Sequence, residues 1–238
     1  MNMEIRCIIS VCIGLCMSFV GMALFRLGVR EVEKQSDTGQ SEIQNEEDKP
    51  VKIPVCALRS RNIWQIAISV SNVIVALFLS VVYTADPLII LRVVFLCTVL
   101  YVCAWTDCIS YLIPNKILLL ALLFWMCLLL VELVLKPWNI RYEIIGDGVS
   151  AAALLLAGIL CRLLVPESVG YGDLKLFIIL GLYLGAGNTW DAVFYTLLAS
   201  FIVSLFLLMT KRVSRKSVMP FAPFLLFGTL LAVFLHGA

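Results

Sequence analysis

The feature that most limits the fold of this chain is its series of long apolar segments. A helix needs about 20 apolar residues to cross the roughly 30 Å hydrocarbon layer of a bilayer. The chain has 238 residues, of which 62% are hydrophobic and only 14% are charged. This pattern predicts an all-α, polytopic integral membrane protein. Eight segments are predicted to span the bilayer, at about 7–26, 64–83, 88–106, 116–135, 144–165, 174–187, 191–210 and 221–236.

The division of the chain follows from its polar stretches. Residues 31–50 are polar, rich in acidic side chains and free of aromatics, which predicts a flexible cytosolic linker. We therefore expect one region over 1–62, a first transmembrane helix with its linker, and a membrane core over 63–238. The function of the linker cannot be derived from its sequence.

The basic residues predict the orientation in the membrane. With the N-terminus outside, fourteen of the eighteen Lys and Arg residues fall on the inside and four on the outside. Basic loops stay in the cytosol, so this bias predicts an outside N-terminus and an even number of spans. The net charge of +2 gives no indication of a nucleic-acid partner, and the expected surrounding is the lipid bilayer.

The nine cysteines contain no C-x-x-C pair. Most of them lie in apolar runs, where a cysteine packs as a small apolar residue. Neither a metal site nor a cofactor is predicted from them.

The first chemically suggestive residue is Asp107, at the end of the third predicted span. A charged side chain in a membrane span is costly and by default indicates function. Ile113, Pro114 and Asn115 follow, and Pro114 suits the first turn of the next helix. Asp107 is therefore expected at a helix C-terminus before a tight cytosolic turn. Taken alone, it is equally well explained as a turn residue without chemistry.

The second is Asp173, in the sequence Gly170-Tyr171-Gly172-Asp173-Leu174-Lys175 at the start of the sixth span. The glycines allow backbone conformations closed to other residues and let another segment come close. Lys175 either tunes the acid or extends to the interface. Taken alone, Asp173 is also explained as a helix N-cap.

The predicted topology places both aspartates at the same depth on the cytosolic side. Two adjacent carboxylates do not both ionise easily, so one keeps a proton. The ionised one can then accept a proton from water while the other hydrogen-bonds a scissile carbonyl. The pair predicts an aspartic endopeptidase. Helix dipoles favour Asp173 as the base and Asp107 as the acid.

These motifs resemble the prepilin leader peptidases, which are GXGD-type aspartic proteases. That family pairs an Asp before an Ile-Pro-Asn or Ile-Pro-Asp turn with an Asp in Gly-x-Gly-Asp-x-Lys. A segment before the last span, Pro-Phe-Ala-Pro, resembles the family's Pro-Phe-Gly-Pro, with Ala222 in place of Gly. The resemblance is best over about 90–230. It implies Asp107 and Asp173 as catalytic residues, supported by Pro114, Asn115, Gly170, Gly172, Lys175, Pro220, Phe221 and Pro223.

The resemblance also implies a substrate and a location. The family removes a basic leader from type IV prepilin or pseudopilin precursors at the cytosolic face of the cell membrane, in type IV pilus assembly and protein secretion. Bifunctional members carry a loop with two C-x-x-C pairs that bind zinc and is linked to N-methylation. The corresponding part of this chain has only Cys56. It resembles an N-terminally reduced form, in which we expect N-methylation to be lost or reduced.

Two alternatives remain at this stage. One is another intramembrane GXGD protease of the signal-peptide or presenilin type, although the Tyr-Asp and Pro-Ala-Leu elements of presenilins do not occur here. The other is a transporter using membrane acids, which should place them near the midplane and often has inverted repeats. The particular pilin, the oligomeric state and the identity of the protonated aspartate cannot be derived from the sequence.

Overall fold

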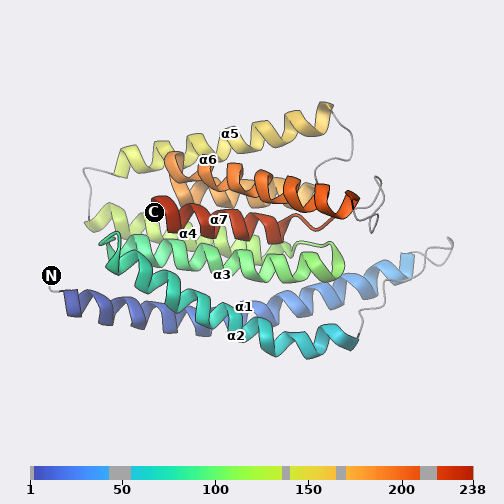
Figure 1. The fold of residues 1–238 in the computed structure, drawn as a ribbon, viewed down its shortest axis with the longest axis horizontal. Coiled ribbons are helices and arrows are strands. Elements are labelled where there is room, and N and C mark those ends of the chain that lie inside the picture. The colour runs from blue at the N-terminus through green and yellow to red at the C-terminus, as the bar shows by residue number, and fades with distance from the viewer. Residues whose placement is uncertain (1–2, 43–54, 136–139, 165–169, 210–218, 238) are drawn as a thin grey trace.

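The computed structural model describes residues 3–42, 55–135, 140–164, 170–209 and 219–237, with backbone alone at 34–42, 55–62 and 140–143. These residues are helical throughout apart from short turns, as the sequence predicts. Figure 1 shows the helices side by side along one direction, with both termini at the same end. They are α1 (Met3–Glu42), α2 (Val55–Val81), α3 (Pro87–Ser110), α4 (Asn115–Leu135), α5 (Ile140–Leu164), α6 (Tyr171–Met209) and α7 (Ala222–His236).

Six of these helices are long and apolar enough to cross a membrane, and α7 is a shorter apolar helix of 15 residues. The described part of the chain is therefore a multi-pass membrane protein. Helix α3 is the central helix. In its most apolar stretch 72% is buried inside the protein, against 39% or less in the other spans.

Helix α6 consists of two arms that meet at Gly185. Its 39 residues would extend about 58 Å as one straight helix, nearly twice the hydrocarbon thickness. Gly185 has φ 67° and ψ −169°, a conformation that favours glycine. Phe177 in the first arm packs on Phe221 at the start of α7, whereas Asn188 in the second arm donates to the carbonyl of Gly237 at its end.

The chain therefore reverses at Gly185, and the first arm (171–184) and second arm (186–209) run antiparallel (Figure 1). With the two arms counted separately, the described residues pass along the bundle eight times. Each predicted span overlaps one helix or one arm. The sixth and seventh predicted spans, 174–187 and 191–210, correspond to the two arms.

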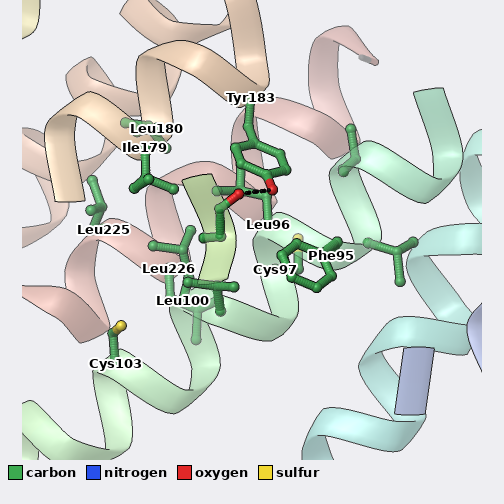
Figure 2. Packing of buried hydrophobic residues seen from close by; sticks show 14 of the residues in the cluster. Phe95, Leu96, Cys97, Leu100, Cys103, Ile179, Leu180, Tyr183, Leu225 and Leu226 are labelled. Atoms are coloured by element: carbon green, nitrogen blue, oxygen red, sulfur yellow. Dashed lines mark hydrogen bonds between the residues drawn. The ribbon is translucent and has the colours of Figure 1, made fainter. Parts of the chain in front are cut away.

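The first arm packs closely on the central helix. Figure 2 shows Tyr183 of α6 beside Phe95 and Leu96 of α3. The Tyr183 ring stacks on Phe95 at 6.1 Å, and its hydroxyl donates to the carbonyl of Ala121 in α4 at 2.7 Å. A buried tyrosine needs such a partner for its hydroxyl. The contact joins three helices around one side chain.

A buried ion pair between Arg92 and Asp147 joins the helices at the end of the bundle near Gly185. Arg92 of α3 donates to the carboxylate of Asp147 in α5 and to the carbonyl of Leu182 in α6. The Trp125 indole N–H of α4 donates to the same carboxylate at 3.3 Å. Charges inside a membrane protein are retained when they are paired in its interior. This cluster ties α3, α4, α5 and α6 together near Gly185.

The prediction of a flexible linker over residues 31–50 is wrong for the first part of that range, because α1 continues as a helix to Glu42. Glu, Lys and Gln are good helix formers, and this part contains no proline. Glu31 is buried, and its carboxylate accepts a hydrogen bond from the backbone N–H of Lys116 at 3.3 Å. The contact attaches α1 to the start of α4. The rest of the predicted linker lies outside the described residues.

Candidate active site

Asp107 lies in the last turn of α3, where the sequence predicts it. The helix ends at Ser110 because Tyr111 adopts a left-handed conformation with φ 53°. The N–H of Tyr111 donates to the carbonyl of Asp107 at 3.0 Å. The Asp107 side chain is only 6% exposed, and its Oδ2 accepts a hydrogen bond from the backbone N–H of Ala222 at 2.9 Å. The carboxylate is therefore held by the start of α7.

The Pro-Phe-Ala-Pro segment supplies this N–H. Phe221 is the N-cap of α7, and Pro223 lies in its first turn, where a proline is tolerated. The first N–H groups of a helix have no partner within the helix and are open to a carboxylate. Because the donor is a backbone group, Ala222 can supply it as well as the glycine of the family motif. The sequence analysis identified this motif. Nothing in the sequence indicates that its backbone is the hydrogen-bond partner of Asp107.

Asp173 lies in the first turn of α6 and is half-buried. Its Oδ2 accepts a hydrogen bond from the backbone N–H of Gly170 at 3.3 Å. The carbonyl of Gly170 accepts from the N–H of Leu174 at 3.3 Å, so Gly170 begins the helical hydrogen bonding. Asp173 therefore reaches back to the cap residue, as the side chain at the N3 position of a capping box does. It does not itself occupy the N-cap position.

The two glycines of this motif do not adopt the unusual backbone conformations that the sequence suggested, since neither has a positive φ. Close approach explains Gly172 instead. A Cβ there would lie 3.0 Å from the Ile113 side chain. Ile113 lies in the turn between α3 and α4, so Gly172 lets the start of α6 pack against the turn that follows Asp107.

Two further contacts hold the start of α6 in place. The Lys175 ammonium donates to the side-chain oxygen of Asn115, the first residue of α4, at 2.7 Å. Phe177 packs edge-on against Phe221 with ring centroids 5.7 Å apart. Pro114, directly before α4, is buried.

The structure thus brings the three sequence motifs together at one end of the bundle. The turn that follows Asp107 packs on Gly172, directly before Asp173. Phe221, beside the N–H that binds Asp107, packs on Phe177, one turn after Asp173. Both carboxylates also lie at helix N-termini, Asp173 in the first turn of α6 and Asp107 against the first turn of α7. Asp107 thus lies between the C-terminal end of α3 and the N-terminal end of α7, whose dipoles act on it in opposite directions. The helix-dipole argument for Asp107 as the acid is therefore weaker than the sequence suggested.

A groove opens beside the motif at the start of α7. This α6–α7 groove has a volume of about 500 Å³ and is lined mainly by apolar side chains, among them Phe201, Pro220, Phe221 and Phe224. It leads from the Pro-Phe-Ala-Pro segment along the second arm of α6. The groove gives an apolar segment of another chain a surface to pack against, and this surface begins next to Asp107.

The comparison with known families turns on the region that holds both aspartates. Residues 94–209 match the type IV leader peptidase family. The matched region, slightly less than half of the chain, is thus similar to this family. The matched region contains Asp107, Asp173 and both arms of α6, and it stops before the motif at the start of α7.

A curated member of the family gives a second comparison. It is the prepilin leader peptidase/N-methyltransferase of Bacillus subtilis (strain 168), which is 32% identical over 140 residues. These residues make up 59% of this chain and 53% of that protein, so the match spans about half of the relative's length. No solved structure matches this chain.

Proposed function

We propose that this chain is a membrane-embedded aspartic endopeptidase that removes the basic leader peptide from type IV prepilin or pseudopilin precursors. The observation that carries the proposal is the position of Asp107 and Asp173 at the same end of the helical bundle, on segments that pack against each other. They come from separate helices, and each is held by a backbone N–H. The similarity of residues 94–209 to the type IV leader peptidase family supports the same activity.

The two carboxylates act as one unit that shares a proton. The ionised carboxylate takes a proton from water while the water oxygen attacks the scissile carbonyl carbon. The protonated carboxyl donates a hydrogen bond to the carbonyl oxygen and stabilises the negative charge that develops there. The carboxyl group that took the proton from water then gives it to the leaving amine, the carbon–nitrogen bond breaks, and the leader and the mature N-terminus are released. Anchoring by Ala222 and Gly170 keeps both carboxylates in position.

The proposed orientation places this end of the bundle at the cytosolic face of the cell membrane. Both chain termini lie at the opposite end (Figure 1). A basic leader stays in the cytosol under the charge bias and is attracted by the two acids. The apolar helix that follows the cleaved bond lies in the α6–α7 groove, which begins beside Phe221.

The helix ends also bear on the transporter alternative. A transporter is expected to place its acids near the midplane of the membrane. Asp107 lies three residues before the end of α3, and Asp173 lies in the first turn of α6. Their position at one end of the bundle supports a reaction at the membrane surface.

We propose the peptidase activity without the N-methyltransferase activity that the name of the Bacillus subtilis relative includes. Between the first span and residue 63 the chain has a single cysteine, Cys56, where the zinc-binding family members have two C-x-x-C pairs.

The proposal is tested by co-expression with a prepilin-like substrate and a gel assay of its processing. Asp107→Asn and Asp173→Asn remove a carboxylate with almost no change of shape, and each is expected to abolish cleavage. Asp191→Asn is the matched control, because Asp191 lies at the far end of the bundle beside His236. It is expected to process normally. All variants are checked for membrane insertion and thermal stability. Normal processing by either active-site variant would refute the proposal.

A further inference from the structure

A second groove lies between α4 and the first arm of α6. This α4–α6 groove has a volume of about 410 Å³, within the range of about 300–1,000 Å³ that is typical of ligand sites. Its walls are apolar along most of their length, formed by Leu118, Leu119, Leu122, Ile178 and Ile179. Its polar lining is confined to one end, where Asn115, Lys116 and Lys175 lie.

The polar end of the groove carries positive charge. The hydrogen bond from Lys175 to Asn115 places the Lys175 ammonium at the start of α4. Lys116 is the next residue along that helix and is exposed. The backbone N–H of Lys116 already binds the Glu31 carboxylate. The positive charge of the groove therefore comes from two lysine side chains, and the helix terminus is already occupied.

Two acidic groups lie near these lysines, and both already have backbone partners. Glu31 accepts from the N–H of Lys116 at 3.3 Å, and Asp173 accepts from the N–H of Gly170 at 3.3 Å. Neither carboxylate lines the groove, whose charged lining residues are the two lysines. The groove thus combines an apolar body inside the membrane with a cationic end at the helix termini.

We propose that the α4–α6 groove binds one anionic phospholipid, with its phosphate at Lys116 and Lys175 and an acyl chain along the apolar walls. Basic pockets between transmembrane helices bind anionic headgroups in this manner. The complementarity is twofold, because a free phosphate would leave the apolar walls empty and a neutral lipid would not match the positive charge of the two ammonium groups. The site is separate from the α6–α7 groove, which lies on the other arm of α6.

The bound lipid would brace the helix starts that position the proposed active site. Lys116 belongs to the first turn of α4, and Lys175 lies two residues after Asp173 in α6. A headgroup that contacts both lysines would reinforce the bond between Lys175 and Asn115.

The experiment uses the full chain in nanodiscs that contain phosphatidylglycerol and phosphatidylcholine in equal amounts. The protein is released into mild detergent, and retained lipid is measured by native mass spectrometry. Wild type is expected to retain one phosphatidylglycerol. Lys116→Gln and Lys175→Gln should each lower its retention about fivefold, which corresponds to roughly 1 kcal/mol for an interfacial lysine. Leu119→Trp, which fills the groove from its exposed wall, should lower it with both lysines intact.

Arg26→Gln is the matched control, because it removes one positive charge from an exposed residue of α1 that does not line the groove. It should retain phosphatidylglycerol as wild type does. Equal retention of the two lipids by wild type would overturn the proposal. An equal loss in Arg26→Gln and Lys116→Gln would also overturn it, since that result indicates diffuse surface attraction. Native gel filtration profiles of all variants confirm that each one is folded.

Discussion

At the scale of single residues, the two acids are each held by one backbone N–H, Asp107 by Ala222 and Asp173 by Gly170. Asp107 and Asp173 stand out because an acid in an apolar chain has few structural uses. Their partners, the N–H groups of Ala222 and Gly170, are backbone atoms that every non-proline residue has. No residue type identifies such a partner, so only the fold reveals it. The sequence also could not show why position 172 is a glycine. A close contact with another segment and an unusual backbone conformation both favour glycine, and only the fold distinguishes them.

Gly172→Ala is expected to slow leader cleavage and lower thermal stability. The added Cβ would lie 3.0 Å from the Cδ1 of Ile113 and 3.1 Å from its Cβ. Overpacking of this kind costs about 1–3 kcal/mol. Gly148→Ala is the control, because a Cβ there meets nothing within 4 Å, and it should be neutral or stabilising. The measurements are substrate processing and thermal unfolding in detergent.

A second change distinguishes a steric effect of Gly172→Ala from a general one. Ile113→Ala creates space opposite the new methyl group and should recover part of the activity in the double variant. If Gly172→Ala processes substrate at the wild-type rate, the close packing of α6 on the α3–α4 turn has no functional weight.

The contact between Phe177 and Phe221 is expected to contribute to the coupling of α6 with α7. Edge-on aromatic pairs contribute about 0.5–1.5 kcal/mol beyond the burial of their surface. Phe177→Leu, Phe221→Leu and the double variant form a thermodynamic cycle that isolates this term. The coupling free energy is obtained from chemical unfolding in detergent. Strictly additive effects of the two substitutions would show that the rings do not interact.

At the scale of elements, hydropathy predicts the helices well, because the length of a span is set by the thickness of the bilayer. The correspondence of spans 174–187 and 191–210 with the two arms of α6 rests on this rule. Hydropathy says nothing about which helices touch, so the central place of α3 could not be foreseen. The buried pair of Arg92 and Asp147 was also missed, because the two residues are distant in sequence.

Gly185→Ala is expected to destabilise the reversal between the arms of α6. At φ 67° and ψ −169°, a region that essentially only glycine adopts, an alanine costs about 1–3 kcal/mol, and its Cβ would lie 3.1 Å from the Asp147 carboxylate. Gly187→Ala, two residues later, places a Cβ in open space and should be neutral or slightly stabilising. Thermal unfolding of the two variants in the same detergent gives the comparison. Equal melting temperatures would show that the reversal does not depend on glycine.

At the scale of the whole molecule, the charge bias predicts both termini on the same side, and the bundle has them at the same end (Figure 1). Which side of the membrane that end faces is a property of the molecule in its bilayer, and the orientation remains a prediction. The sequence also could not show that the segment after the predicted first span stays helical to Glu42, because polar composition alone does not separate a solvated helix from a flexible linker.

The orientation is tested with reporter fusions in a bacterial host. Alkaline phosphatase, which is active only outside the cytosol, is expected to be active when fused after Ala238 and inactive when fused after Met209. A fluorescent protein that folds only in the cytosol should give the opposite pattern at the same two positions. The reverse pattern for both reporters would place Asp107 and Asp173 on the outer face and contradict cleavage in the cytosol.

The short length of α7 has a consequence for hydration. Its 15 residues extend only about 22 Å, several ångströms less than the hydrocarbon layer. A bilayer accommodates a short helix by local thinning, which draws headgroups and solvent inward. Thinning at the start of α7 would bring solvent to the Asp107 side chain, which the backbone holds there. A hydrolytic reaction consumes one solvent molecule for each bond cut, and a depression in the membrane surface would deliver it without a channel through the protein.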